Sequence, residues 1–142
     1  MQQEDFIKRQ IEQLSRVLGK ILFDLVGLTK GNVADAIEVT NQAIRNELNL
    51  DIDEIINLPV DKTLDILINE KKLSGTNLES FADILYQIAN VTPPPQDNKA
   101  NKLFEKGLAI YEYLNATSKT YSLDRNFKID KIKRTIDLLA TD

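Results

Sequence analysis

Apolar residues recur at alternating steps of four and three along the first thirty positions of the chain. This heptad spacing places them on one stripe of a single long helix. In the second half of the segment, Leu22, Phe23 and Val26 widen the stripe, so we expect that half to be buried on more sides. Gly27 and Gly31 favour an end to the helix. The stripe consists of Ile7, Ile11, Leu14, Leu18, Ile21, Leu25 and Leu28.

The next two segments predict shorter helices with recognisable first residues. Asn32 can cap a helix whose apolar stripe begins at Val33 and ends at Leu48. Asp51 lies three residues before Glu54, which is the spacing of a capping box, and this predicts a short helix or a single turn.

Prolines punctuate the middle of the chain. Pro59 is tolerated in a first turn and restarts a helical segment that continues to Gly75. Thr76 and Glu79 again have capping-box spacing and open another helix. The run Thr92–Pro95 ends that helix, because three prolines cannot continue it and favour an extended spacer.

Two more helices are expected after the prolines. The first begins at Asp97 or Asn98, and residues 117–122 form a loop. The last helix runs from about Leu123 to Leu139. Its inward positions are expected at Phe127, Ile132, Ile136 and Leu139. No segment alternates at period two, so the prediction is an all-α fold, a helical bundle or array of α-α hairpins with about six helices.

The length of 142 residues fits one domain, residues 1–142. Its core is large enough to be stable without a disulfide or a structural metal ion. The spacer Pro93–Pro95 is the best candidate for a boundary inside that domain. It would divide the chain into a helical bundle, residues 1–92, and a C-terminal helical hairpin, residues 97–142.

The composition restricts the chemistry. The chain has no cysteine and no histidine, which excludes disulfides, thiolate metal sites and the Ser-His-Asp and Cys-His mechanisms within it. The net charge of −4 argues against a nucleic-acid partner. The acidic start is unlike a signal peptide, and residues 21–28 are too short to span a bilayer. We therefore expect a cytoplasmic protein with no membrane partner.

The charges are unevenly distributed. Residues 31–97 hold twelve acidic and four basic side chains, whereas residues 98–142 hold nine basic and six acidic ones. An acidic middle with basic ends favours self-association or electrostatic pairing of the chain's own halves.

The heptad stripe has two interpretations. It is a dimer or partner-helix interface formed by Ile7, Ile11, Leu14 and Leu18, or it packs inside its own domain. The two interpretations are compatible if the N-terminal half of the helix extends away from the domain while the wider second half packs in the core.

Acidic pairs at helical spacing suggest an alternative, a carboxylate-dependent Mg²⁺ or Mn²⁺ hydrolase acting on a nucleotide or phosphate ester. The metal candidates are Asp35 with Glu38, three residues apart, and Glu79 with Asp83, four apart. Asp and Glu are also favoured at helix starts by the helix dipole, and we prefer that interpretation of these pairs. No cofactor is predicted.

The C-terminal segment mixes basic, acidic and aromatic residues. Its basic residues alternate with three aspartates at helical spacing, which is typical of an exposed face with local ion pairs. Tyr111 lies on a buried stripe, so its hydroxyl needs a partner. Tyr121 precedes the expected N-cap at Ser122 and is expected to make a staple-like contact. The basic residues are Arg125, Lys128, Lys131, Lys133 and Arg134.

Two stretches of sequence resemble known families. The opening motif, Glu4-Asp5-Phe6-Ile7-x-Arg9-x-Ile11, and residues 103–125 are similar to an uncharacterised bacterial family of all-helical proteins, which implies a helical fold and no assigned activity. The C-terminal hairpin weakly resembles a tetratricopeptide unit, with Leu103, Gly107, Leu108 and Tyr111 in the packing positions of its first helix.

These observations favour a protein–protein interaction or scaffolding module that acts through apolar helix faces. The partner is another protein or a second copy, in which case the N-terminal helix forms a homodimer.

Overall fold

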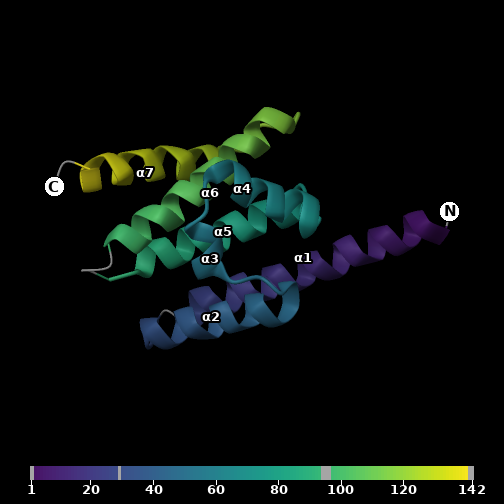
Figure 1. The fold of residues 1–142 in the computed structure, drawn as a ribbon, viewed down its shortest axis with the longest axis horizontal. Coiled ribbons are helices and arrows are strands. Elements are labelled where there is room, and N and C mark those ends of the chain that lie inside the picture. The colour runs from purple at the N-terminus through teal and green to yellow at the C-terminus, as the bar shows by residue number, and fades with distance from the viewer. Residues whose placement is uncertain (1, 29, 94–96, 141–142) are drawn as a thin grey trace.

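The computed structural model describes residues 2–28, 30–93 and 97–140, and every regular element in these ranges is helical (Figure 1). The all-α prediction is therefore confirmed. The segment between Asp51 and Gly75 is more divided than expected, because it forms two short α-helices and a π-helix. In order, the elements are α1 (Gln2–Leu28), α2 (Val33–Leu48), α3 (Ile52–Ile56), α4 (Val60–Asp65), η1 (Ile66–Glu70), α5 (Thr76–Val91), α6 (Asp97–Thr117) and α7 (Leu123–Ala140).

The long helices stack in a simple order around α5. Helix α2 packs on α1, α1 on α5, α5 on α6 and α6 on α7, while α3 and α4 cover another part of α6. Figure 1 shows this order, with the α1–α2 pair at one side of the molecule and α7 at the opposite side. Helix α5 is buried on most of its surface, from Leu78 to Ala89. The core therefore centres on α5, whose neighbours come from both ends of the chain.

Three of the expected helix caps are present. The side-chain oxygens of Asn32 and Ser122 each accept the backbone N–H three residues later, at 3.1 Å. Asp51 accepts an N–H in the same way at 2.9 Å, two residues later. The capping box expected at Thr76 and Glu79 is wrong: Thr76 is already helical, and the N-cap position is occupied by Gly75, which has no side chain to form a cap.

The heptad stripe of α1 is divided between two environments. Leu18 and Leu25 are fully buried and Ile21 is nearly so, which places them in the core against α5 and α2. The expectation that this half is buried on more sides is wrong, because Phe23 is 79% exposed and Val26 and Leu28 are also exposed. Ile7 remains 54% exposed and Ile11 remains 42% exposed. Figure 1 shows the reason: the N-terminal end of α1 extends beyond the ends of the other helices. We call residues 5–13 the overhang.

The predicted inward face of α7 needs correction. Phe127 is 61% exposed, because the face that packs on α6 is set by Ile129 and Ile132, with Ile136 partly buried beside them. Residues two positions apart on a helix point about 200° apart, so Phe127 must face solvent when Ile129 is buried. The staple expected for Tyr121 is also wrong, since that side chain is 74% exposed. The side chain of Leu139 lies outside the described residues.

The division of the chain into residues 1–92 and 97–142 stays a prediction. Most of the spacer Pro93–Pro95 lies outside the described residues. The helices on either side of it, α5 and α6, nevertheless form the most extensive helix–helix contact in the described part of the chain. Gly107 of α6 is buried at this contact, and a Cβ added there would lie 3.8 Å from the carbonyl oxygen of Ala82. That distance is an ordinary van der Waals contact, so a methyl group at this position would pack directly against α5.

The divided stripe predicts different costs for one kind of substitution. Leu18→Ala removes a fully buried side chain and should lower the free energy of unfolding by about 2–5 kcal/mol. Ile7→Ala, on the same stripe, should change it by no more than about 0.5 kcal/mol. Urea denaturation at low protein concentration measures both values. Similar losses for the two variants would contradict the division.

Candidate functional site

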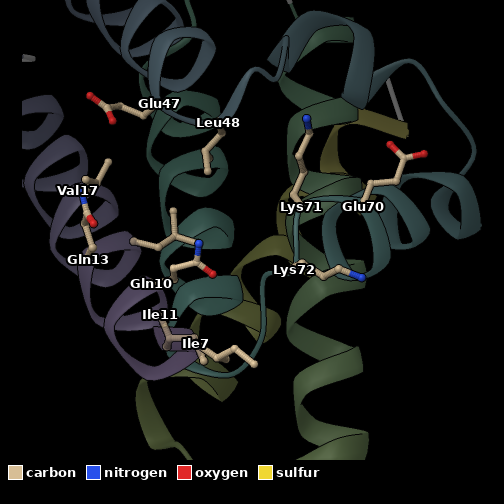
Figure 2. A pocket seen from close by; sticks show the side chains of 11 residues that line it. Ile7, Gln10, Ile11, Gln13, Val17, Glu47, Leu48, Glu70, Lys71 and Lys72 are labelled. Atoms are coloured by element: carbon tan, nitrogen blue, oxygen red, sulfur yellow. The ribbon is translucent and has the colours of Figure 1, made fainter. Parts of the chain in front are cut away.

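A groove of about 690 Å³ lies where the overhang meets the body of the protein. Figure 2 shows its two sides: Gln10, Ile11 and other α1 residues on one, and the segment after η1 on the other. The groove is lined by Ile7, Gln10, Ile11, Gln13, Leu14 and Val17 of α1, Glu47 and Leu48 of α2, and Glu70, Lys71 and Lys72.

The α1 side of the groove carries no charge. All six α1 residues that line it are aliphatic or glutamine. The charged residues of the same stretch, such as Lys8 and Glu12, are exposed but do not line the groove. A helix that separates its side chains in this way presents a surface suited to contact with another apolar surface, with amide groups to form hydrogen bonds at its edge.

The opposite side is built from unusual backbone. Helix α2 ends with Asn49 in the left-handed conformation, a common C-cap geometry, and its carbonyl oxygen accepts a hydrogen bond from Lys71 Nζ at 3.1 Å. The π-helix η1 ends with the N–H of Lys71 bonded to the carbonyl of Ile66 at 2.9 Å. Lys72 follows with φ +60°, a conformation that few residues other than glycine adopt. The two bonds of Lys71 fix this residue at the rim, between Glu70 and Lys72.

The inner end of the overhang is fixed by a buried amide. Asn77, in the first turn of α5, is 1% exposed. It accepts a hydrogen bond from the Ser15 hydroxyl and donates one to the carbonyl oxygen of Ile11 at 3.4 Å. Because α5 begins here, the residues of α1 before Ile11 have no α5 surface to pack against.

A second polar cluster joins α7 to the centre of the fold. The guanidinium of Arg125 donates two hydrogen bonds to Glu79 of α5, at 3.1 and 2.8 Å, and a third to Asn115 of α6 at 3.0 Å. The Arg125 side chain is 8% exposed and that of Glu79 is 24% exposed. A paired, bidentate geometry of this kind compensates for the cost of burying the charges.

One turn further along α5, Asp83 accepts hydrogen bonds from the Tyr111 hydroxyl and from Lys128 Nζ, the latter at 2.9 Å. Lys128 also pairs with Asp124 at 3.0 Å and lies 5.7 Å from the centre of the Tyr86 ring. Each carboxylate of α5 is therefore neutralised by a cation from α7.

The cluster changes the acidity of three groups. Burial raises the pKa of the Tyr111 phenol far above its usual range, and the negative charge of Asp83 raises it further. The hydrogen bond to Glu79 raises the pKa of Arg125, although burial opposes this. Burial lowers the pKa of Lys128, but its hydrogen bond to Asp83 and the charge of that carboxylate outweigh this, so the net pKa is raised. All three groups keep their protons at neutral pH.

The structure separates the four carboxylates considered for a metal site. Asp35 and Glu38 are exposed on α2, whereas Glu79 and Asp83 belong to the α5–α7 cluster and are paired with Arg125 and Lys128. Among the described residues, no group of three or more acidic side chains is placed to hold a metal ion. The geometry therefore gives the hydrolase alternative no support.

Two features of these sites were not predicted from the sequence. Arg125 is not part of an exposed basic face as expected, and its place on one helical stripe with Ile129, Ile132 and Ile136 was a signal that it points inward. The groove rim was not predicted either, because the π-helix that positions Lys71 has no recognisable pattern in the sequence.

The fold and the groove define an all-α protein whose candidate site is an open surface groove. The chain belongs to the family of unknown function DUF6483, whose family model matches residues 1–142. This agrees with the resemblance of its opening motif to an uncharacterised helical family. No curated protein and no solved structure matches the chain. Within the described residues, no helix is both long enough and apolar enough to cross a membrane.

Removal of the Arg125 side-chain charge should destabilise the fold. Arg125→Met leaves Glu79 partly buried without its partner, and we expect a loss of about 2 kcal/mol in the free energy of unfolding. Lys133→Met, at an exposed position of α7, is the matched control and should cost no more than about 0.5 kcal/mol. Urea denaturation measures the free energy of unfolding of both variants. Equal losses for the two would contradict a stabilising role of the Arg125 pair.

Tyr111 should make the fold sensitive to alkaline pH. Its folded pKa is raised, so its contribution to stability is complete below its unfolded pKa of about 10 and is lost as the pH rises above that value. Tyr111→Phe removes this proton linkage and the hydrogen bond to Asp83. The wild type should therefore be more stable than Tyr111→Phe at pH 8, with a difference that shrinks by up to about 1.4 kcal/mol per pH unit above pH 10. Denaturant titrations across this range measure the difference, and a constant difference would contradict the linkage.

Proposed function

We propose that this protein is an interaction module that binds another protein surface through the overhang and the adjoining groove. One observation carries the proposal: the apolar stripe of α1 leaves the core at Leu14 and continues, exposed, through Ile11 and Ile7. An exposed apolar surface beside a groove is typical of a protein–protein contact.

The stability of the overhang supports the same proposal. An isolated helix of fewer than about 12–15 residues is marginal in water, and most helical stability comes from packing of an apolar face. The overhang is helical but has little of its own chain to pack against. A bound partner would supply the missing contact and cover Phe6, which is 61% exposed.

Two finer expectations accompany the proposal. We place the module in the cytoplasm of a bacterial cell, in line with the expectation from the sequence and with the bacterial family that its opening motif resembles. We also propose that the α6–α7 hairpin contributes scaffolding by analogy with a tetratricopeptide unit, an analogy that rests on Gly107 and Tyr111 at packing positions of α6.

Site-specific photo-cross-linking tests the proposal in the full chain. A photoreactive amino acid replaces Ile7 in one variant and Val39 in the other, which is a matched control because Val39 of α2 is also apolar and is 52% exposed. After irradiation in the source cells, we expect a discrete adduct from position 7, identified by mass spectrometry and lost when Ile11→Asp is added. No adduct from position 7, or an equal adduct from position 39, would contradict an interaction site on the overhang.

A further inference from the structure

We propose that the occupant of this surface is a second copy of the same chain, and that the two overhangs pair antiparallel about a two-fold axis between Ile7 and Ile11. This inference rests on the proposed function and names the partner. Three observations carry it: the exposure along the stripe, the position of the body relative to the overhang, and the charges beside the exposed isoleucines.

Exposure fixes the register. Of the first four residues of the stripe, Leu18 is fully buried and Leu14 is partly buried in the core of its own chain. The other two, Ile7 and Ile11, remain exposed. An antiparallel contact that covers both must place Ile7 of one copy opposite Ile11 of the other, and the two-fold axis then repeats the same contact in reverse. Such a self-complementary patch is what a two-fold dimer requires.

The position of the body selects the antiparallel direction. The hydrogen bonds of Asn77 hold α1 to the body at Ile11 and Ser15, and the fully buried positions begin at Leu18. The body of each copy therefore lies at the C-terminal end of its overhang. Antiparallel pairing places the two bodies at opposite ends, whereas parallel pairing would bring them to the same end.

The charges that flank the stripe are complementary in this register. Lys8 directly follows Ile7 and Glu12 directly follows Ile11, so both lie on the same side of the apolar stripe. With Ile7 opposite Ile11, Lys8 of one copy and Glu12 of the other are offset by about 3 Å along the axis, which long side chains can span. The two-fold axis produces this pair twice. Parallel pairing about a two-fold axis would place Lys8 of one copy and Glu12 of the other on opposite faces of the contact, so this ion pair would not form.

The groove would also contact the second copy in this antiparallel pair. With Ile7 opposite Ile11, the first turn of one copy lies alongside Leu14 of the other. Leu14 lines the groove together with Val17 and Leu48, which are apolar. The groove of each copy would therefore receive the N-terminal turn of its neighbour, so that the apolar part of the groove and the overhang cover each other.

Reversal of the flanking charges tests the pairing directly. Lys8→Glu creates a chain with two acidic groups at these positions, and Glu12→Lys creates one with two basic groups. Each variant alone should dimerise about tenfold more weakly than the wild type, because like charges then face each other. An equimolar mixture should recover the wild-type affinity within about threefold. Lys20→Glu, exposed on α1 beyond the overhang, is the matched control and should leave the affinity unchanged. Sedimentation equilibrium measures all five affinities, those of the wild type, the two reversals, their mixture and the control.

Recovery in the mixture identifies contact between chains, since an effect within one chain cannot be rescued by a second one. Reversals that leave dimerisation unchanged, or a mixture that fails to recover, would overturn the proposed pairing. A wild-type chain that stays monomeric up to about 0.1 mM would overturn the second copy as occupant. If the chain is monomeric while position 7 cross-links to a different protein, the second-copy inference is wrong and the interaction module stands. If position 7 forms no adduct at all, both fail.

Discussion

The packing of α1 against α5 organises the rest of this structure. Leu18, Ile21 and Leu25 bury one stripe of α1 in the core, and each fully buried leucine or isoleucine contributes roughly 1.5–3 kcal/mol. The contact can extend only as far as α5 does, and α5 begins beside Ile11 and Ser15, where Asn77 bonds to α1. The same stripe that stabilises the fold is therefore exposed as soon as its partner helix ends.

A second constraint keeps the far side of the fold in place. Helix α7 has few buried apolar residues, and its position depends on Arg125 and Lys128, which pair with Glu79 and Asp83 of the central helix. A pair of this geometry fixes orientation more than it adds stability, because desolvation offsets much of the attraction. These carboxylates serve the architecture, and the surface left for a partner lies on the overhang of α1, next to Asn77 in the first turn of α5.

The helical pattern could be predicted from the sequence because apolar spacing and caps such as Asn32 and Ser122 are local signals. The division of the α1 stripe needed the structure, since residues 7 and 18 have the same pattern and differ only in whether another helix reaches them. Phe127 was misplaced because aromatic residues favour the core only on average, and Ile129 sets the phase of α7. The groove could not be predicted, because it brings together segments near residues 10, 48 and 71, and one of its sides depends on a π-helix.

Amide hydrogen exchange along α1 tests the central claim, that one continuous stripe serves the core at one end and a partner at the other. Amides of residues 18–25 should exchange slowly at every protein concentration, because they open only when the core opens. Amides of the overhang should exchange quickly in dilute protein and become protected as the concentration rises and the chains associate. Fast exchange in the overhang at all concentrations, even in the presence of an identified partner, would contradict the claim.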